Sequence, residues 1–279
     1  MTGFVVIPTY NRVSKLKEMV DQLQAQISSE PLQFIFVDSG SSDGSANYIQ
    51  SIAKSDSRYR LIQGSQKWWW ARAAQEGLSY ALDQAAADDF IVLLNDDVQI
   101  EQDFFQVGSQ LLGQHPKSVF GSMLKVDNGE IEGAVTRDVR DFSVYAVSKQ
   151  TLPEPFEQDL VSGRGAFYPT SVFRAGANVR YRKLPHYLAD FDLSSQAKKL
   201  GFKILGSSRL YVKSGAEFGN SHSKSRSLFW KMFATQSAYR IISQYHFWRL
   251  ESGFSKGQTT VKLLRRRLSA LILQSWTRG

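Results

Sequence analysis

The fold is decided by the segment FIVLLNDD, residues 90–97, in which five apolar residues precede an amide and two carboxylates. The apolar run has the length of a buried strand. Asp96 and Asp97 follow it directly, and adjacent carboxylates repel unless a cation or hydrogen-bond donors neutralise them. Their hard oxygen atoms suit Mg²⁺ or Mn²⁺. The alternative is a solvated turn before a helix near Glu101, with Asp97 as an ordinary surface charge.

Other strand-like runs come before this segment and alternate with helical patterns. The sequence predicts strands over residues 3–7, 34–37 and 59–62, with the first run ended by Pro8, and helices over residues 13–27, 43–53 and 71–82. Apolar strands separated by helices predict an α/β fold with a mainly parallel sheet that is covered on both faces. Because ligands of such sheets bind beyond the carboxyl ends of the strands, functional residues are expected directly after each strand.

The second half of the chain has a different pattern. Short β-like runs at 119–125, 130–136 and 142–148 predict an antiparallel excursion. A Gly-rich turn follows at 162–165, then a helix over 190–200, and two helical stretches complete the chain.

The composition excludes several classes of protein. With 42% hydrophobic and 22% charged residues, the 279-residue chain is expected to be globular. It contains no cysteine, which excludes disulfides, thiolate metal sites and cysteine nucleophiles. No apolar run approaches the length of about 18 residues that a membrane-spanning helix needs. The N-terminus lacks the pattern of a cleaved secretory signal, so none is expected.

The net charge of +8 belongs to the end of the chain. Residues 222–279 contain 11 of the 34 basic residues and one of the 26 acidic residues, Glu251, which leaves 23 basic against 25 acidic residues in the rest. In the last helical stretch, apolar residues including Val261 and Leu264 share one face and basic residues share the other. We favour contact with a membrane surface. The alternative is packing of the apolar face on the rest of the chain or on a second subunit.

Polar residues also follow the first two strands. The segments are PTYNR at 8–12 and DSGSSDG at 38–44. An acidic residue at a strand end can accept hydrogen bonds from a base or ribose, and glycines allow close approach of the backbone. The alternative is that Asp38 closes a turn while Ser42 or Asp43 caps a helix.

Further candidates lie elsewhere in the chain. Asp190 begins a predicted helix and is either a general base or a cap. The three indoles of WWW, residues 68–70, cannot share one face of a regular element, so at least one is expected to be available for stacking on a sugar or base. His186 and His222 are each either a metal ligand or a structural residue.

Together these motifs resemble the family 2 glycosyltransferases, which have the GT-A fold. The resemblance rests on VVIPTYNR at 5–12, FVDSGSSDG at 36–44 and LLNDD at 93–97. The segments WWW at 68–70, GRG at 163–165 and LPHYLADFDL at 184–193 are similar to the bacterial branch that is described as rhamnosyltransferase-like. This resemblance covers roughly residues 3–215.

The resemblance implies a domain division and a reaction. A catalytic domain at 1–215 would comprise a nucleotide-binding half at 1–100 and an acceptor-side half at 101–215, followed by a basic helical extension at 216–279. The implied reaction is inverting transfer of a sugar from a UDP- or dTDP-sugar to a hydroxyl of a saccharide or lipid-linked acceptor, in synthesis of a bacterial surface polysaccharide or lipid-linked glycan. The implied place is the cytoplasm, peripherally at the inner face of the membrane.

It also implies residue roles. Asp190 would be the catalytic base, and Asp97 would hold Mn²⁺ or Mg²⁺, with His222 as a candidate second ligand. The donor nucleotide would contact Pro8, Thr9, Tyr10, Asn11, Arg12, Asp38, Ser39, Gly40, Asp43 and Asp96. The sugar and acceptor would contact Trp68, Trp69, Trp70, Gly163, Arg164, Gly165, His186 and Asp192.

Four positions depart from the family pattern. Asn95 replaces the first carboxylate of the metal motif, and Ala189 replaces the glutamate that usually precedes the base. Gln75 stands where an asparagine is common, and VKSG at 212–215 lacks the metal-binding histidine that often follows the last strand. These departures bear on metal affinity more than on the fold.

Two other function classes are compatible with parts of the sequence. A nucleotidyltransferase also combines an α/β sheet with acidic metal ligands. A nucleic-acid-binding protein would use the basic C-terminal region, with Trp68–Trp70 stacking on bases. Because the candidate site is rich in carboxylates, which repel phosphate backbones, nucleic acid is not an expected partner.

Overall fold

The computed structural model describes residues 1–26, 28, 31–125, 131–148, 154–213, 228–235, 237 and 240–276. Its strands form one sheet with the order β3-β2-β1-β4-β10-β6-β11-β5, extended by a β7–β8 hairpin and by β9. The strands are β1 (Gly3–Thr9), β2 (Leu32–Asp38), β3 (Tyr59–Gln63), β4 (Phe90–Leu93), β5 (Gln99–Ile100), β6 (Ser118–Lys125), β7 (Ile131–Asp138), β8 (Ser143–Ser148), β9 (Phe156–Glu157), β10 (Ala166–Pro169) and β11 (Lys203–Lys213).

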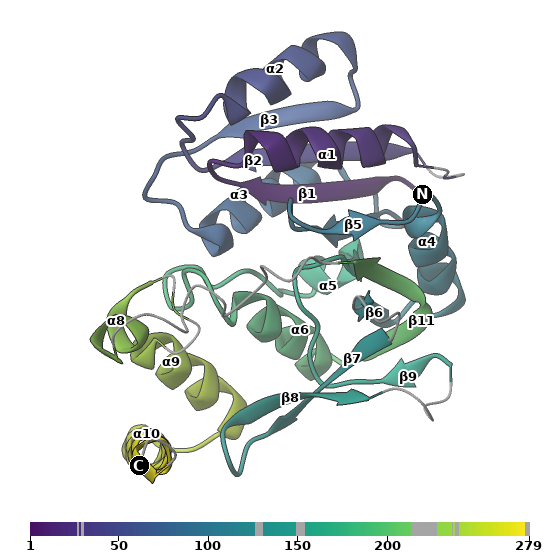
Figure 1. Cartoon of the computed structure of the whole chain (residues 1–279). Helices are drawn as coiled ribbons and strands as arrows, with labels where there is room; N and C mark the ends of the chain where they lie inside the picture. Colours follow the sequence, from purple (N-terminus) through teal and green to yellow (C-terminus); the bar gives the residue numbers. More distant parts are fainter. Residues whose placement is uncertain are drawn as a thin grey trace.

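The helices cover this sheet and extend the molecule at one end. They are α1 (Val13–Gln24), α2 (Ser45–Ser55), α3 (Trp70–Gln84), α4 (Phe104–Gln114), α5 (Thr170–Arg174), α6 (Ala189–Lys199), α8 (Leu228–Phe233), α9 (Ile241–Ser252) and α10 (Lys256–Trp276). Figure 1 shows α2 and β3 at one end of the molecule and α10 at the other.

The predicted parallel sheet is confirmed in the first hundred residues. β3, β2, β1 and β4 are paired in parallel, so the segments that follow them emerge at one edge. The sequence prediction that Pro8 ends the first strand is wrong, because β1 continues to Thr9. Val6 accepts a hydrogen bond from Leu94 on the β4 side, and Pro8, two residues on, faces the same side after β4 has ended. Its missing N–H therefore costs no ladder bond.

The sheet is buried on both faces, as its apolar strands require. In β1, Val5 and Ile7 belong to the apolar cluster that includes α1 and α4, whereas Phe4 and Val6 belong to the cluster that includes α3 and α6. Alternate side chains of a strand point to opposite faces, so one strand contributes to both layers of the core. This packing holds the strand ends in fixed positions.

The second half contains the expected antiparallel excursion within a mixed arrangement. β7 pairs antiparallel with β6 and β8, and β10 runs antiparallel to β4. β6 also pairs in parallel with β11, which places the late strand inside the same sheet. β10 therefore delivers the Gly-rich turn that precedes it to the carboxyl end of β4.

The C-terminal helices pack on the rest of the chain. Trp248 of α9 is 1% exposed and stacks on Phe142 with ring centroids 5.0 Å apart and planes inclined by 3°. Phe247 and, from α10, Leu263 belong to the same core cluster. Among the residues that the structure describes, no helix is long and apolar enough to cross a membrane.

A buried ion pair adds to this packing. The side chain of Glu251 in α9 is fully buried and forms ion pairs with Arg137 of β7 and with Lys199 of α6, the latter at 2.8 Å. The Ser195 hydroxyl donates to the same carboxylate at 2.7 Å. The one acidic residue of the basic C-terminal region is therefore turned inward.

Candidate active site

The loops after β1 and β2 are joined to each other at the edge of the sheet. The amide of Ser42 donates to Asn11 Oδ1 at 2.8 Å, and the amide of Val13 donates to Asp43 Oδ2 at 2.8 Å. The other Asp43 oxygen accepts from Ser45 at 2.6 Å. Asp43 thus contacts the first residues of α1 and α2, whereas the N-cap residues of these helices are Arg12 and Gly44. Asn11 and Asp43 position the loops of the candidate donor site.

Asp38 ends β2 beside Thr9 of β1 and is 2% exposed. Its Oδ2 accepts hydrogen bonds from the amides of Gly40 at 3.0 Å and Ser41 at 2.9 Å. Its Oδ1 is buried and has no hydrogen-bond partner. A buried acceptor without a partner is costly, so Asp38 presents an oxygen that a ligand donor can satisfy.

The backbone around Asp38 is closely packed. Gly40 has φ of 81°, and a Cβ there would lie 2.8 Å from the amide nitrogen of Gln66. Ser39 is buried and its amide donates to the Thr9 carbonyl at 3.0 Å. Tyr10, by contrast, is 46% exposed at the outer surface of the site.

An arginine bridges the carboxylate pair after β4. Arg12 Nη1 donates to Asp96 Oδ1 at 2.8 Å and to Asp97 Oδ2 at 2.5 Å. The second Asp96 oxygen accepts from the Thr9 hydroxyl at 2.7 Å. Asp96 is 4% exposed, so it is not the solvated turn residue of the alternative interpretation. Burial raises the pKa of Asp96 to about 6, against the lowering effect of the Arg12 guanidinium.

The donor set fits a divalent ion in part. Asp97 Oδ1 is buried without a hydrogen-bond partner, which suits a metal ligand. The Asn95 amide oxygen is already engaged by Trp70 Nε1 at 2.9 Å. In the described part of the chain, no three His, Cys, Asp or Glu side chains form a metal-binding group, and His222 lies outside the described residues. Mg²⁺ and Mn²⁺ sites built from one carboxylate and substrate phosphates are nevertheless common.

Asp190 lies in the first turn of α6 and contacts the Gly-rich turn. Its Oδ2 accepts from the amide of Gly163 and its Oδ1 from the amide of Phe191, each at 2.9 Å. Burial raises the pKa of Asp190 above its ordinary value, although these donors and the charge of Arg164 oppose the rise. A raised pKa makes a carboxylate a better proton acceptor.

Trp70 connects Asp190 to the residues after β4. A Cβ on Gly163 would lie 2.4 Å from the Trp70 ring, so the indole packs against the bare backbone. The amide of Gly165, at φ of 102°, donates to the Leu93 carbonyl at 2.9 Å. Burial, together with the charges of Asp190 and Asp97, raises the pKa of Tyr187. The segments that carry Asp190 and Asp97 therefore converge on the same edge of the sheet.

Asp192, predicted to contact the sugar or acceptor, is engaged elsewhere. It is 1% exposed, forms an ion pair with Arg180 at 3.1 Å and accepts from the Gln196 amide at 2.8 Å. One oxygen thus ties α6 to the preceding loop through Arg180, and the other is engaged within α6 by Gln196.

The family model that matches the chain is "Glycosyl transferase family 2", over residues 4–176. The protein is a family 2 glycosyltransferase. Its curated relative in Campylobacter jejuni, a GalNAc(5)-diNAcBac-PP-undecaprenol β-1,3-glucosyltransferase, is 25% identical over 172 residues. The match covers 61% of this chain and 50% of the relative, so the chain spans about half of the relative's length.

Solved structures place the glycosyltransferase in the GT-A fold. GalNAc-T7 with UDP, GalNAc and Mn²⁺ has a TM-score of 0.64 at 13% identity, covering 77% of this chain and 44% of that chain. A mannosyltransferase from Pyrobaculum calidifontis with GDP-Man and Mn²⁺ has a TM-score of 0.57 at 14% identity. The match covers 97% of this chain and 75% of the mannosyltransferase chain. S. aureus TarS 1–349 with UDP-GlcNAc has a TM-score of 0.58 at 16% identity. The match covers 96% of this chain and 73% of the TarS chain.

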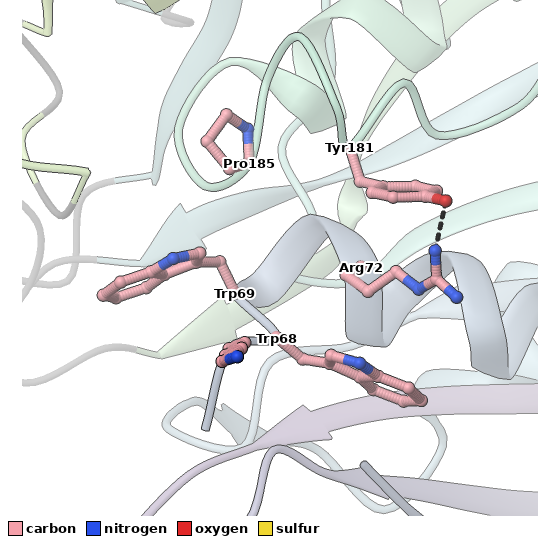
Figure 2. Close-up of a pocket in the computed structure, with 6 residues that line it drawn as sticks. Trp68, Trp69, Arg72, Tyr181 and Pro185 are labelled. Carbon is pink, nitrogen blue, oxygen red and sulfur yellow. Dashed lines mark hydrogen bonds between the residues drawn. The ribbon is translucent and has the colours of Figure 1, made fainter. Parts of the chain in front are cut away.

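The glycosyltransferase also has an aromatic pocket of 190 Å³, whose lining includes Trp68, Trp69, Arg72, Tyr181 and Pro185 (Figure 2). The Arg72 guanidinium lies between two rings, 5.4 Å from the Trp68 centroid and 4.3 Å from that of Tyr181. Arg72 also donates to the Tyr181 hydroxyl. The pocket thus has apolar faces and a fixed cation.

The His186 ring lies beside Trp69, which lines this pocket, and beside Tyr187. Its ring centroid is 6.0 Å from that of Trp69 and 4.7 Å from that of Tyr187. Burial lowers the pKa of His186 to about 4, so the imidazole is neutral near pH 7. Its Nδ1 is buried and has no hydrogen-bond partner.

Sequence reasoning missed two features of this site. It did not single out Arg72 or Tyr181, which are 109 residues apart and carry no motif. The sequence predicted that Arg12 contacts the donor nucleotide, but not that it pairs with Asp96 and Asp97. A basic residue directly after one strand could have suggested such a pairing, because carboxylates follow another strand at the same edge of the sheet.

Proposed function

We propose that this glycosyltransferase is an inverting enzyme that transfers a sugar from a UDP- or dTDP-sugar to a hydroxyl of a saccharide or lipid-linked acceptor. The observation that carries this proposal is a pair of unpartnered carboxylate oxygens, Asp38 Oδ1 and Asp97 Oδ1, at the ends of two strands in one sheet. The first suits a donor group of a nucleotide, and the second suits a cation on the diphosphate.

The donor would lie along the joined loops. Asp38 would accept a hydrogen bond from the base or ribose, with Pro8, Thr9, Ser39 and Gly40 forming the floor. Tyr10 is exposed above this floor and is free to cover the base. The narrower assignment to the rhamnosyltransferase-like branch rests on the WWW and LPHYLADFDL motifs.

Asp97 would bind Mn²⁺ or Mg²⁺, with the remaining ligands supplied by the diphosphate and water. Such an ion neutralises charge that develops on the departing diphosphate. Three structural neighbours were solved with UDP, GDP-Man with Mn²⁺, or UDP-GlcNAc, which supports a nucleotide sugar as donor.

Asp190 would act as the general base. It would take the proton of the acceptor hydroxyl while that oxygen forms a bond to the anomeric carbon. The bond between the anomeric carbon and the diphosphate oxygen breaks on the opposite face, which inverts the configuration. The amides of Gly163 and Phe191 orient the carboxylate.

The acceptor would occupy the side of the site that contains the aromatic pocket. Trp69 and His186 lie between the pocket and Tyr187, which is electrostatically coupled to Asp190. Aromatic faces beside a fixed arginine suit stacking and hydrogen bonding of a saccharide. The Campylobacter relative is named for a lipid-linked oligosaccharide, which supports an acceptor of that class.

We also propose that the C-terminal helices contact the membrane surface at its cytoplasmic face. Phe233, Ile242, Val261 and Leu264 are large apolar residues that are exposed on α8, α9 and α10. Because Glu251 is buried and paired, no acidic side chain of this region offsets its basic residues at the surface. An exposed apolar and basic surface suits anionic lipid.

A thermal-shift screen tests the donor proposal. UDP- and dTDP-sugars should stabilise the protein by RT ln(1 + [L]/Kd), more strongly with Mn²⁺ than with EDTA. Asp38→Asn should weaken the binding of every nucleotide sugar. Asp97→Ala should remove only the additional stabilisation that Mn²⁺ gives. A nucleoside triphosphate together with a sugar phosphate is included in the screen as the control for the alternative function, a nucleotidyltransferase. If no nucleotide sugar stabilises the wild type, the proposed function is wrong.

A further inference from the structure

One arginine bridges both carboxylates of the candidate metal site and offsets one of their two negative charges. Arg12 lies 84 residues before Asp96, yet its Nη1 lies within hydrogen-bond distance of both aspartates. Its backbone is fixed at the start of α1, where its amide donates to Ser45 Oγ at 3.3 Å and its carbonyl accepts from Leu16 at 2.9 Å. The Arg12 side chain is 46% exposed, so it can turn away without any change in the fold.

The position of this guanidinium conflicts with a bound divalent ion. Arg12 takes one oxygen of Asp97 and leaves only Oδ1 available. Asp96 is a poor replacement, because it is 4% exposed and each of its oxygens already accepts a hydrogen bond, one from Arg12 and one from Thr9. Two cations on one carboxylate repel each other strongly at contact distance. A metal that binds Asp97 through both oxygens therefore requires Arg12 to leave.

We propose that Arg12 is a displaceable counterion. It pairs with Asp96 and Asp97 in the resting enzyme, keeps the affinity for free divalent ions low, and leaves Asp97 when the donor binds. The diphosphate is the group that attracts the released guanidinium, because it carries the opposite charge and fits the arginine fork. This last step rests on the proposed function, whereas the competition between Arg12 and the metal does not.

This arrangement couples the binding of metal and nucleotide. In the wild type, Mn²⁺ alone must displace Arg12 with no compensating contact for the arginine. With UDP present, Arg12 exchanges a carboxylate for a phosphate, so each ligand strengthens the other. A fixed ion pair between Arg12 and the aspartates would also lower metal affinity through its charge, but it would not make UDP strengthen Mn²⁺ binding through Arg12.

The direct test is binding of Mn²⁺ alone, measured by titration with EPR detection of free Mn²⁺. Arg12→Gln should bind Mn²⁺ roughly tenfold more tightly than the wild type, because a charge-assisted hydrogen bond of this kind changes an equilibrium by about that factor. Arg58→Gln is the matched control. Arg58 is 47% exposed and pairs with Asp56 at 2.7 Å, outside the site, so its removal should leave Mn²⁺ affinity unchanged.

Further variants locate the effect and guard against misfolding. Arg12→Gln/Asp97→Asn should lose the gain in Mn²⁺ affinity. Arg12→Lys keeps the charge that faces the aspartates and should stay close to the wild type. Circular dichroism before each titration checks that the variants are folded. UDP should strengthen Mn²⁺ binding less in Arg12→Gln than in the wild type.

Three results overturn the proposal: equal Mn²⁺ affinity of folded wild type and Arg12→Gln, no measurable binding by either, or a gain that survives Asp97→Asn. The Mn²⁺ titration contains no nucleotide, so its outcome is independent of the donor. A gain in Arg12→Gln together with failure of all nucleotide sugars would reject the proposed function and leave the competition between Arg12 and metal in place.

Discussion

Backbone groups hold the proposed catalytic carboxylate in place. Asp190 accepts one amide hydrogen bond from Gly163 and one from Phe191, and each oxygen keeps a lone pair for an acceptor hydroxyl. Asp190→Asn should therefore lower turnover by about 10²–10⁴-fold while donor affinity stays within twofold or so. Asp192→Asn, on the same helix, is the control that should lower stability but not remove the base. Normal turnover by folded Asp190→Asn would exclude the base assignment.

His186 gives a pH prediction at the same scale. Because burial lowers the pKa of His186 from 6.5 to about 4, the unfolded chain takes up a proton at this residue that the folded chain refuses. Its contribution to the free energy of unfolding is present above about pH 6.5 and is lost as the pH falls toward 4. His186→Gln should lose less stability than the wild type between about pH 7 and pH 5. Urea unfolding at several pH values measures this difference. An equal loss of unfolding free energy in the wild type and in His186→Gln over this pH range would contradict the prediction.

At the scale of elements, α9 is fixed to β7 and α6 by one carboxylate. Glu251 is fully buried and pairs with Arg137, which is 17% exposed, and with Lys199, which is half exposed, so neutralising it leaves the largely buried Arg137 without this carboxylate. Glu251→Gln should lower the free energy of unfolding by about 3 kcal/mol. Glu18→Gln is the control, because Glu18 pairs with Lys15 in an exposed i,i+3 pair that contributes little. Chemical denaturation followed by tryptophan fluorescence measures both. A loss below about 1 kcal/mol in Glu251→Gln would show that the apolar contacts of Trp248 alone hold α9.

At the scale of the whole molecule, α10 lies at the end opposite α2 and β3 (Figure 1) and carries the exposed apolar residues Val261 and Leu264. If this end binds lipid, Val261→Ser/Leu264→Ser should reduce flotation with vesicles of phosphatidylcholine and phosphatidylglycerol. Binding to pure phosphatidylcholine should be weaker, because the basic residues then lack anionic partners. Leu200→Ser, which changes an exposed leucine of the catalytic part, is the control. Unchanged flotation of the double variant would reject the lipid contact. A wild-type dimer that the double variant abolishes would identify the face as a subunit interface.

The sequence by itself determined the α/β class, the alternation of strands and helices in the first hundred residues, and the placement of polar motifs after those strands. These features depend on local patterns: apolar runs, 3–4 spacing and turn residues, which the chain carries whatever surrounds it. The same locality explains the error at Pro8, because only pairing with β2, together with the early end of β4, shows that a proline is tolerated there.

Only the tertiary structure decided which charges meet. The contacts of Arg12 with Asp96 and Asp97, of Arg72 with Tyr181, and the inward position of Glu251 all join residues that are distant in the chain. An arginine or a glutamate looks alike in the sequence whether it is solvated or buried, since its role depends on the partner that folding brings to it. The strand order places those partners, and no local pattern encodes it.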